Sequence, residues 1–304
     1  MKLHENKEIF QELITATSNH FNIRKSLIEK DYFIVLILKE ASSSIPGLVF
    51  KGGTSLSKCH KIIDRFSEDV DLTLNVEHSS QTFKRGAIRK LIDICNKYPL
   101  ELTNKEQIRK HTHGVYNLYL IKYPFEQNDD LIKPNIFVEM VNILKCYPSE
   151  QSEINSYIGE YLSIIGRFDI IDEYELKPFK INVQSLNRTL VDKVFAICDY
   201  CLRNEVIRNS RHIYDIARLL EKVPLNDELA VLIHQVRNDR KKNKKCVSAQ
   251  DGVSVNQILK EIIKSEFYKN DYNNVTKNLL FKPYDYETAI DSLQTLINSG
   301  LFEL

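Results

Sequence analysis

The amino-acid sequence predicts a mixed α/β (α+β) fold, with a small mixed sheet in the first half and a mainly helical second half. Two helical patterns open the chain, and short strand-like runs separated by turns and a helix follow them. From about residue 150 onward, helical patterns dominate. We therefore expect one part over residues 1–150 and a second over 151–304, with a boundary near 149–156.

The first half contains elements of both kinds. Apolar residues recur at helical spacing in 9–14 and in 27–38, and Ile45-Pro46-Gly47 then breaks the chain. We expect a helix over Thr54–Ile63, with Thr54 or Ser55 capping its N-terminus. The other elements expected here are a buried strand at 48–50, a turn at Gly52-Gly53, a strand at 70–76, a helix at 82–97 and strands at 115–123 and 136–143.

The second half shows helical periodicity. Its expected helices are 187–202, 213–223, 228–236, 255–267 and 286–297. The charge run Arg237–Lys245 is expected to be an exposed loop. In Cys198-Asp199-Tyr200-Cys201 we favour core packing over a zinc or redox site, because no further ligand pair lies nearby.

Composition excludes several classes of protein. The 304 residues carry 42 basic and 41 acidic side chains, so nucleic-acid binding would need a local patch. The six cysteines are scattered, as in a cytosolic protein with reduced thiols. The N-terminus has no signal-peptide pattern, and the longest apolar run, Phe33–Leu38, is too short to span a membrane. We expect a cytoplasmic enzyme.

Two carboxylates alternate along one expected strand. Asp69 and Asp71 are two residues apart, so they point to the same side while Val70 and Leu72 point to the other. Such a pair suits Mg²⁺ or Mn²⁺, which take oxygen ligands. Glu139 is the one charge within an apolar strand, where a lone buried carboxylate would be costly, and it is the expected third ligand. An Asp-x-Asp pattern alone is also common on solvated strands.

The Gly52-Gly53 turn lies upstream of these carboxylates. A strand, a glycine turn and the start of a helix together let the backbone approach a phosphate group. Ser67 adds a hydroxyl close to the carboxylates in sequence. The chain has no Gly-x-x-x-x-Gly-Lys-Ser/Thr pattern, which excludes a P-loop NTPase.

Five segments carry a resemblance to a known family. They are KGGTSL at 51–56, RFSEDVDL at 65–72, EKDY at 29–32, LVDKVFA at 190–196 and RHIYDI at 211–216. They resemble, in the expected order, the motifs of the AbiEii/AbiGii toxin family within the DNA polymerase β-like nucleotidyltransferase superfamily. Two departures are Asp192, where the family usually has Glu, and His212, where it often has Asp.

The resemblance implies a bilobed fold, in which a nucleotidyltransferase domain and a helical lobe enclose a cleft. It implies transfer of a nucleoside monophosphate from an NTP to an acceptor hydroxyl, with RNA or tRNA as the expected acceptor. It also implies a toxin of a toxin–antitoxin or phage-defence (abortive infection) system, with a cognate antitoxin as partner.

The resemblance also implies roles for single residues. Asp69, Asp71 and Glu139 would bind the metal ions, and Glu139 would also orient or deprotonate the attacking hydroxyl. Asp215 would position Lys193 or the acceptor, with Arg211 beside it. The residues expected to bind the nucleotide are Lys51, Gly52, Gly53, Thr54, Ser67, Lys193 and Arg211.

Other interpretations remain open from sequence. One alternative is the same chemistry with a protein or a small-molecule acceptor such as an aminoglycoside. Another is a binding protein on a retired transferase scaffold. His111 and His113 are expected to have a surface role. Glu29-Lys30-Asp31 is either a charged surface turn or part of the cleft, and Arg237–Lys245 is a candidate contact for RNA phosphates.

Overall fold

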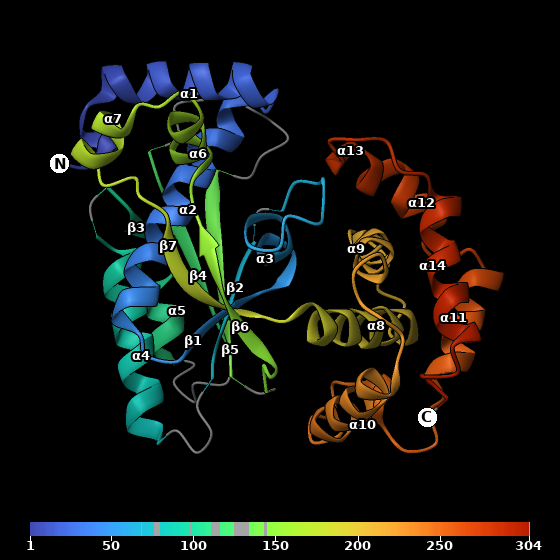
Figure 1. Cartoon of the computed structure of the whole chain (residues 1–304). Coiled ribbons are helices and arrows are strands. Elements are labelled where there is room, and N and C mark those ends of the chain that lie inside the picture. Colours follow the sequence, from blue (N-terminus) through green and yellow to red (C-terminus); the bar gives the residue numbers. More distant parts are fainter. Residues whose placement is uncertain are drawn as a thin grey trace. The chain divides into compact units, whose positions relative to one another are not determined.

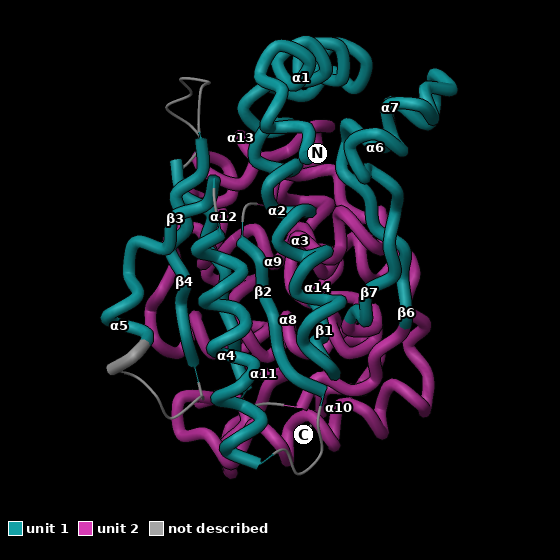
Figure 2. Tube along the Cα trace, turned by 90° about the vertical axis from the view of Figure 1, so that its left-hand side faces the viewer, with its two compact units in different colours: residues 1–50, 68–142, 151–183 teal, residues 51–67, 143–150, 184–304 magenta. Residues whose placement is uncertain are grey.

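The computed structural model describes residues 1–67, 69–75, 80–97, 99–110, 116–124, 134–142 and 145–303, without the side chains of 109 and 110. It divides into two compact units, which Figure 2 shows in different colours. Unit 1 comprises residues 1–50, 68–142 and 151–183, and unit 2 comprises 51–67, 143–150 and 184–304. The division is less simple than one boundary near 150, because 51–67 belongs with the second unit and 151–183 with the first.

A seven-stranded mixed sheet runs through the described residues, in the order β3-β4-β5-β2-β1-β7-β6. Its strands are β1 (Leu48–Lys51), β2 (Asp69–Leu74), β3 (Glu101–Leu102), β4 (Tyr116–Lys122), β5 (Asn135–Val141), β6 (Ser149–Ile154) and β7 (Phe179–Gln184). The pairs β1–β7 and β2–β5 are parallel, while β3–β4 and β4–β5 are antiparallel. The expected mixed α/β class is confirmed.

The helices of unit 1 lie around this sheet (Figure 1). They are α1 (Lys7–Phe21), α2 (Lys25–Ser44), α4 (Gln81–Cys95), α5 (Lys105–Lys110), α6 (Tyr157–Ile164) and α7 (Phe168–Glu173), with a 3₁₀ turn, η1, at Leu3–Glu5. Ser80 begins α4 by accepting a hydrogen bond from the Phe83 N–H at 3.2 Å. Helix α4 packs on α2, β3 and β4.

The structure excludes one of the two interpretations of Glu29-Lys30-Asp31, which lie on α2. Glu29, Lys30 and Asp31 do not form a surface turn, because all three are buried in this helix. The Asp31 carboxylate accepts a hydrogen bond from the Tyr157 N–H at 2.8 Å, which ties α2 to the start of α6 within unit 1. The EKDY segment therefore has a packing role in the fold.

Unit 2 is mainly helical. Its elements are α3 (Gly52–Lys58), α8 (Leu186–Leu202), α9 (Arg211–Leu220), α10 (Asp227–Arg240), η2 (Val247–Ala249), α11 (Val255–Lys264), α12 (Lys269–Asp271), η3 (Tyr272–Thr276), α13 (Lys277–Leu279) and α14 (Tyr286–Asn298). Helix α8 packs against α9, α10 and α11, and α14 packs against α9 and α11. Their apolar faces form one core, in which Phe195, Tyr268 and Phe302 are fully buried.

The charge run at 237–245 differs from expectation at its start. Helix α10 continues to Arg240, so only the later part of the run lies in turns. Arg240 is buried and donates to Asp199 at 2.8 Å and to Asp192 at 3.4 Å. The buried guanidinium of Arg240 links two carboxylates within the helical core. The sequence pattern alone does not show whether an arginine at this position is buried or exposed.

The two cysteines of the C-x-x-C segment lie on α8, as expected. Cys198 is fully buried in the helical core, and both thiols are free. His111 and His113 lie outside the described residues. No helix in the described ranges is long and apolar enough to span a membrane.

Candidate active site

The three expected metal-binding carboxylates lie on two adjacent parallel strands of unit 1. The register of β2 on β5 places Asp71 opposite Glu139 and Asp69 opposite Phe137. Register partners point to the same face of a sheet, so Asp69, Asp71 and Glu139 share one face. Val70 and its partner Val138 point to the other face and are fully buried.

Tyr116 on β4 marks the neighbourhood of these carboxylates. Burial raises the pKa of its hydroxyl first, and the negative charges of Glu139, Asp71 and Asp69 raise that pKa further. Tyr116 lies two residues before Leu118, the register partner of Glu139, so its side chain points to the same face as the carboxylates. Tyr116 was not predicted as a site residue, because a tyrosine at the start of a strand carries no sequence signal for such a role.

The donor set fits a divalent cation in its chemistry. Hard cations such as Mg²⁺ take carboxylate oxygens, and often only one or two of them together with substrate phosphates. Across the residues that the structure describes, no three His, Cys, Asp or Glu side chains are arranged closely enough to hold a metal as they stand. What fits is the shared face and the oxygen chemistry of Asp69, Asp71 and Glu139.

The Gly52-Gly53 turn begins α3 in unit 2. Gly52 has φ +77°, in the left-handed region that glycine adopts without strain. A Cβ added to Gly53 would lie 2.6 Å from Arg65 Nη2 and 2.6 Å from Ser67 Oγ. Both glycines are therefore required by local geometry, the first by its backbone angle and the second by close packing.

The expected cap of this helix was wrong. Helix α3 starts at Gly52, and no side chain caps its N-terminus. Thr54 instead donates from its hydroxyl to the Ser67 hydroxyl at 3.1 Å, and Ser55 donates to the Gly52 carbonyl at 2.8 Å. The two hydroxyls of Thr54 and Ser67, both predicted to bind nucleotide, are thus brought together beside the turn.

A buried ionic cluster lies in the core of unit 2. Arg65 grips the Asp215 carboxylate with both ends of its guanidinium, at 2.7 Å from Nε and 2.8 Å from Nη2. Lys193 Nζ donates to the same carboxylate at 2.6 Å. Asp215 is 0%, Arg65 2% and Lys193 6% exposed. One carboxylate therefore holds two cations, one beneath the glycine turn and one on α8.

The charges in this cluster shift one another's pKa. Burial alone would raise the pKa of Asp215, but the charges of Arg65 and Lys193 outweigh it and hold that pKa well below its usual range. Burial lowers the pKa of Lys193, and Asp215 opposes that shift. Asp215 therefore opposes the effect of burial and favours the charged form of Lys193.

His212 and Arg211 extend the cluster at the start of α9. The His212 ring stacks on Tyr200, with centroids 5.6 Å apart and planes at 22°, and its Nδ1 lies 3.4 Å from Lys193 Nζ. Burial and the charges of Lys193 and Arg211 lower the pKa of His212 well below its ordinary value. His212 is therefore neutral at pH 7, so the departure from the family pattern places no further cation beside Lys193.

Lys51, the last residue of β1, has a different electrostatic environment. Its positive charge lowers the pKa of Asp192, after the larger effects of burial, Arg188 and Arg240.

Arg65 was quoted only as part of a motif and was missed as a site residue. Its partner Asp215 lies 150 positions away in sequence, and no local pattern links the two.

Taken with the fold, these residues define a nucleotidyltransferase. A family model described as the nucleotidyl transferase AbiEii toxin of a type IV toxin–antitoxin system matches residues 36–294. The chain therefore belongs to the AbiEii family of nucleotidyltransferase toxins.

One solved structure with a similar fold is MenT4, a nucleotidyltransferase toxin from Mycobacterium tuberculosis H37Rv. The TM-score is 0.63 and the sequence identity 15%, over 96% of this chain and 90% of that one. At this identity the likeness concerns the fold. A search of curated proteins finds no match to this chain.

Proposed function

We propose that this toxin uses a divalent metal ion to transfer a nucleoside monophosphate from an NTP to a hydroxyl of RNA, with tRNA as the acceptor. The observation that carries the proposal is the register of β2 on β5, which puts Asp69, Asp71 and Glu139 on one face of the sheet. Three hard oxygen donors on one face are what a phosphoryl-type transfer requires.

The carboxylates have two roles in this proposal. Asp69, Asp71 and Glu139 hold Mg²⁺ or Mn²⁺, which when bound neutralises phosphate charge and stabilises the leaving pyrophosphate. Glu139 also orients the acceptor hydroxyl and accepts its proton. The acceptor oxygen bonds to the α-phosphorus, and the bond from that phosphorus to the bridging oxygen of the β-phosphate breaks and releases pyrophosphate.

The glycine turn and its neighbours bind the triphosphate. Gly52 and Gly53 allow close approach of phosphate oxygens. The Ser67 hydroxyl donates to those oxygens, and the Thr54 hydroxyl orients it by donating to it at 3.1 Å. Chain connectivity supports a joint role with the carboxylates, because a single residue separates Ser67 from Asp69. Lys51 adds positive charge from the adjoining end of β1.

Lys193 supplies charge to the same phosphates, with Arg211 beside it. The Lys193 ammonium is a point charge suited to phosphate, and the Asp215 contact at 2.6 Å keeps it protonated and fixed. Of the two roles expected for Asp215, positioning Lys193 is the one that this contact supports. Asp215 therefore acts through Lys193 and does not touch the nucleotide.

The biological setting follows from the family. A type IV system pairs the toxin with an antitoxin, so we infer a cognate antitoxin, a cytoplasmic site of action and growth arrest or abortive infection as the outcome. The alternatives are a protein or small-molecule acceptor, or a binding protein that has lost catalysis.

The test is a transfer assay with each of the four NTPs, labelled at the α-phosphate, and with tRNA, protein or aminoglycoside as acceptor. We expect label on tRNA, dependence on Mg²⁺ or Mn²⁺, and loss of at least 100-fold in Asp69→Asn and Asp71→Asn, since removing electrostatic stabilisation typically costs that much. Glu101→Gln, an exposed carboxylate on β3, is the matched control and should retain activity. Label on protein or antibiotic alone would assign a different acceptor, and no transfer at all would favour the binding protein.

A further inference from the structure

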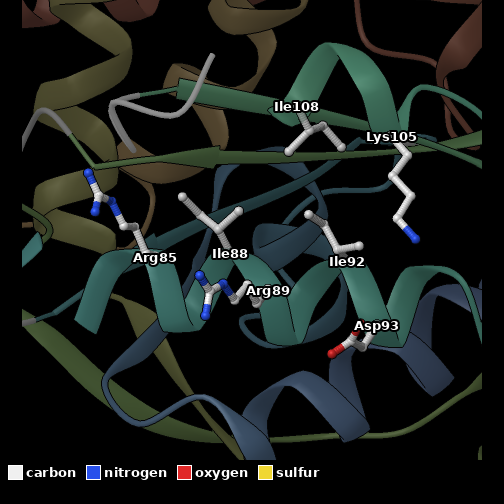
Figure 3. Close-up of a pocket in the computed structure, with 7 residues that line it drawn as sticks. All are labelled: Arg85, Ile88, Arg89, Ile92, Asp93, Lys105 and Ile108. Carbon is white, nitrogen blue, oxygen red and sulfur yellow. The ribbon is translucent and has the colours of Figure 1, made fainter. Parts of the chain in front are cut away.

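A pocket of about 560 Å³ lies between α4 and α5 in unit 1. Its lining residues are Arg85, Ile88, Arg89, Ile92, Asp93, Lys105 and Ile108 (Figure 3). The volume falls within the range of 300–1,000 Å³ that is usual for small-molecule sites. None of these residues belongs to the candidate active site.

The pocket has an apolar middle with charges around it. Ile88 and Ile92 of α4 point toward Ile108 of α5, as Figure 3 shows. Arg85 lies toward one end, whereas Lys105 and Asp93 lie toward the other. A ligand that fits must therefore combine an apolar body with at least one anionic group.

The two arginines favour an anion. They are four residues apart on α4, where two like charges repel each other by a few tenths of a kcal/mol. Both are exposed, and neither makes an ion pair or side-chain hydrogen bond with any residue in the described part of the chain. The planar guanidinium binds phosphate with two parallel hydrogen bonds and also stacks on flat rings.

Asp93 distinguishes between anionic ligands. Its carboxylate accepts hydrogen bonds from N–H groups and repels a second carboxylate. A nucleoside phosphate offers a phosphate for Arg85 and Arg89, a flat ring for the isoleucines and exocyclic N–H groups for Asp93. An acidic peptide offers carboxylates and would meet Asp93 unfavourably, so the lining favours the nucleotide.

The pocket is separate from the carboxylate face. Helix α4 packs against the other face of the sheet, where Tyr119 of β4 is fully buried and its pKa is raised by burial and by nearby Cys95 of α4. Tyr119 pairs in register with Val138, whose side chain points away from Glu139's face. A nucleotide in the pocket is therefore not the one that reacts.

We propose that this pocket binds one nucleotide unit of an RNA strand at a distance from the reacting end. The choice of RNA over a free nucleotide as the source of that unit rests on the proposed function. The pocket then contributes to selecting RNA as the acceptor, through phosphate contacts from α4 and a base held over the three isoleucines.

The experiment measures binding of a fluorescent single-stranded RNA of five nucleotides to the full chain by anisotropy, in EDTA and without NTP. The test variant is R85A/R89A. The control is K84A/K90A, which removes the same charge from α4 at positions outside the lining. We expect at least tenfold weaker binding for the test variant and less than threefold for the control. The slope of log affinity against log salt should fall by about 0.7, since Arg85 and Arg89 contact one phosphate and each neutralised phosphate of a single strand contributes about 0.7.

Further arms separate the sources of the ligand. Displacement of the RNA by AMP, lost in R85A/R89A, supports a pocket for one nucleotide. If fluorescently labelled AMP binds to the chain but the RNA does not, the ligand is a free nucleotide and the role in RNA binding is overturned. If RNA binding is weakened equally in both double variants, the effect comes from the overall charge of α4 and not from the pocket. If an acidic peptide binds in preference to RNA, the pocket is a protein docking site. Either result refutes the proposal. Since no NTP or metal is present, failure here leaves the transfer assay unaffected.

Discussion

Replacing Asp215 with asparagine tests whether this carboxylate holds the core of unit 2 together. The change preserves shape but removes the charge that pairs with Arg65 at 2.7 and 2.8 Å and with Lys193 at 2.6 Å. Removing one partner of a buried ion pair typically costs about 3–5 kcal/mol, because the remaining charge is left uncompensated. Here two cations lose a carboxylate that both contact, and one asparagine oxygen can accept from only some of the same donors.

We expect the free energy of unfolding of Asp215→Asn to fall by about 3–5 kcal/mol at pH 7. The assay is urea denaturation followed by circular dichroism, since the chain has no tryptophan to report by fluorescence. The depressed pKa of Asp215 sets the pH window. The native state favours the ionised carboxylate, so its stabilisation is complete above the unfolded pKa of about 4 and is lost as pH falls through the folded value. The difference between wild type and variant should shrink in acid.

Asp199→Asn is the matched control for this measurement. Asp199 is equally part of the helical core, where it accepts from Arg240 at 2.8 Å and from the Ser248 hydroxyl at 2.7 Å. We expect a comparable loss of stability in this variant but retention of transfer activity below its unfolding transition. Asp215→Asn should lose both. An unchanged urea midpoint for Asp215→Asn would refute the argument that its carboxylate neutralises two buried cations.

Three further changes test other parts of the site. Gly53→Ala would place a methyl group 2.6 Å from two side-chain atoms, so we expect at least a tenfold loss of transfer activity. Its control is Gly86→Ala, in α4 with open space around it. This control should keep transfer activity, and its free energy of unfolding should rise by about 0.5–1 kcal/mol in urea denaturation. The pKa of His212 is lowered in the folded state, so the free energy of unfolding of the wild type should decrease as the pH drops below about 6.5, by up to about 1.4 kcal/mol per pH unit. In His212→Gln the urea midpoint should depend less on pH in this range. For Asp71→Asn we expect the midpoint shift that saturating Mg²⁺ produces in the wild type to be reduced, whereas an undiminished shift would place the metal elsewhere.

The sequence predicted the carboxylate face because strand periodicity is local. Alternation over Asp69–Leu74 determines which side chains share a side, and the parallel pairing with β5 then aligns Asp71 with Glu139. The same kind of local pattern located most helices of unit 2 within a few residues of their observed ends. The strands β6 and β7 were missed. Strand β6 (Ser149–Ile154) is almost entirely polar and carries no alternation, whereas in β7 the apolar Phe179, Ile181 and Val183 do alternate with polar residues, and this signal was overlooked.

The ionic cluster of unit 2 was not predictable in the same way. Arg65 and Asp215 are joined by tertiary packing across 150 positions, and no local pattern pairs them. Asp215 was expected beside Lys193 only through the resemblance to a known family. The prediction of the N-terminal cap of α3 failed for a related reason. Thr54 has the residue type of a helix cap, but its hydroxyl is taken by Ser67, thirteen positions later.

The last prediction concerns the charge of Lys193, which contacts Asp215 and is proposed to contact the phosphates as well. Within this trio, Arg65 and Lys193 carry two positive charges and Asp215 carries one negative charge. Without the carboxylate, burial and the charges of Arg65 and Arg211 lower the pKa of Lys193 further, because Asp215 opposes these effects in the wild type. If transfer requires charged Lys193, the alkaline limb of the pH–rate profile must move to lower pH in Asp215→Asn, measured on whatever activity the variant retains. A limb at the wild-type pH would show that Asp215 does not hold the proton of Lys193, and the proposed positioning role would be wrong even where the loss of stability is observed.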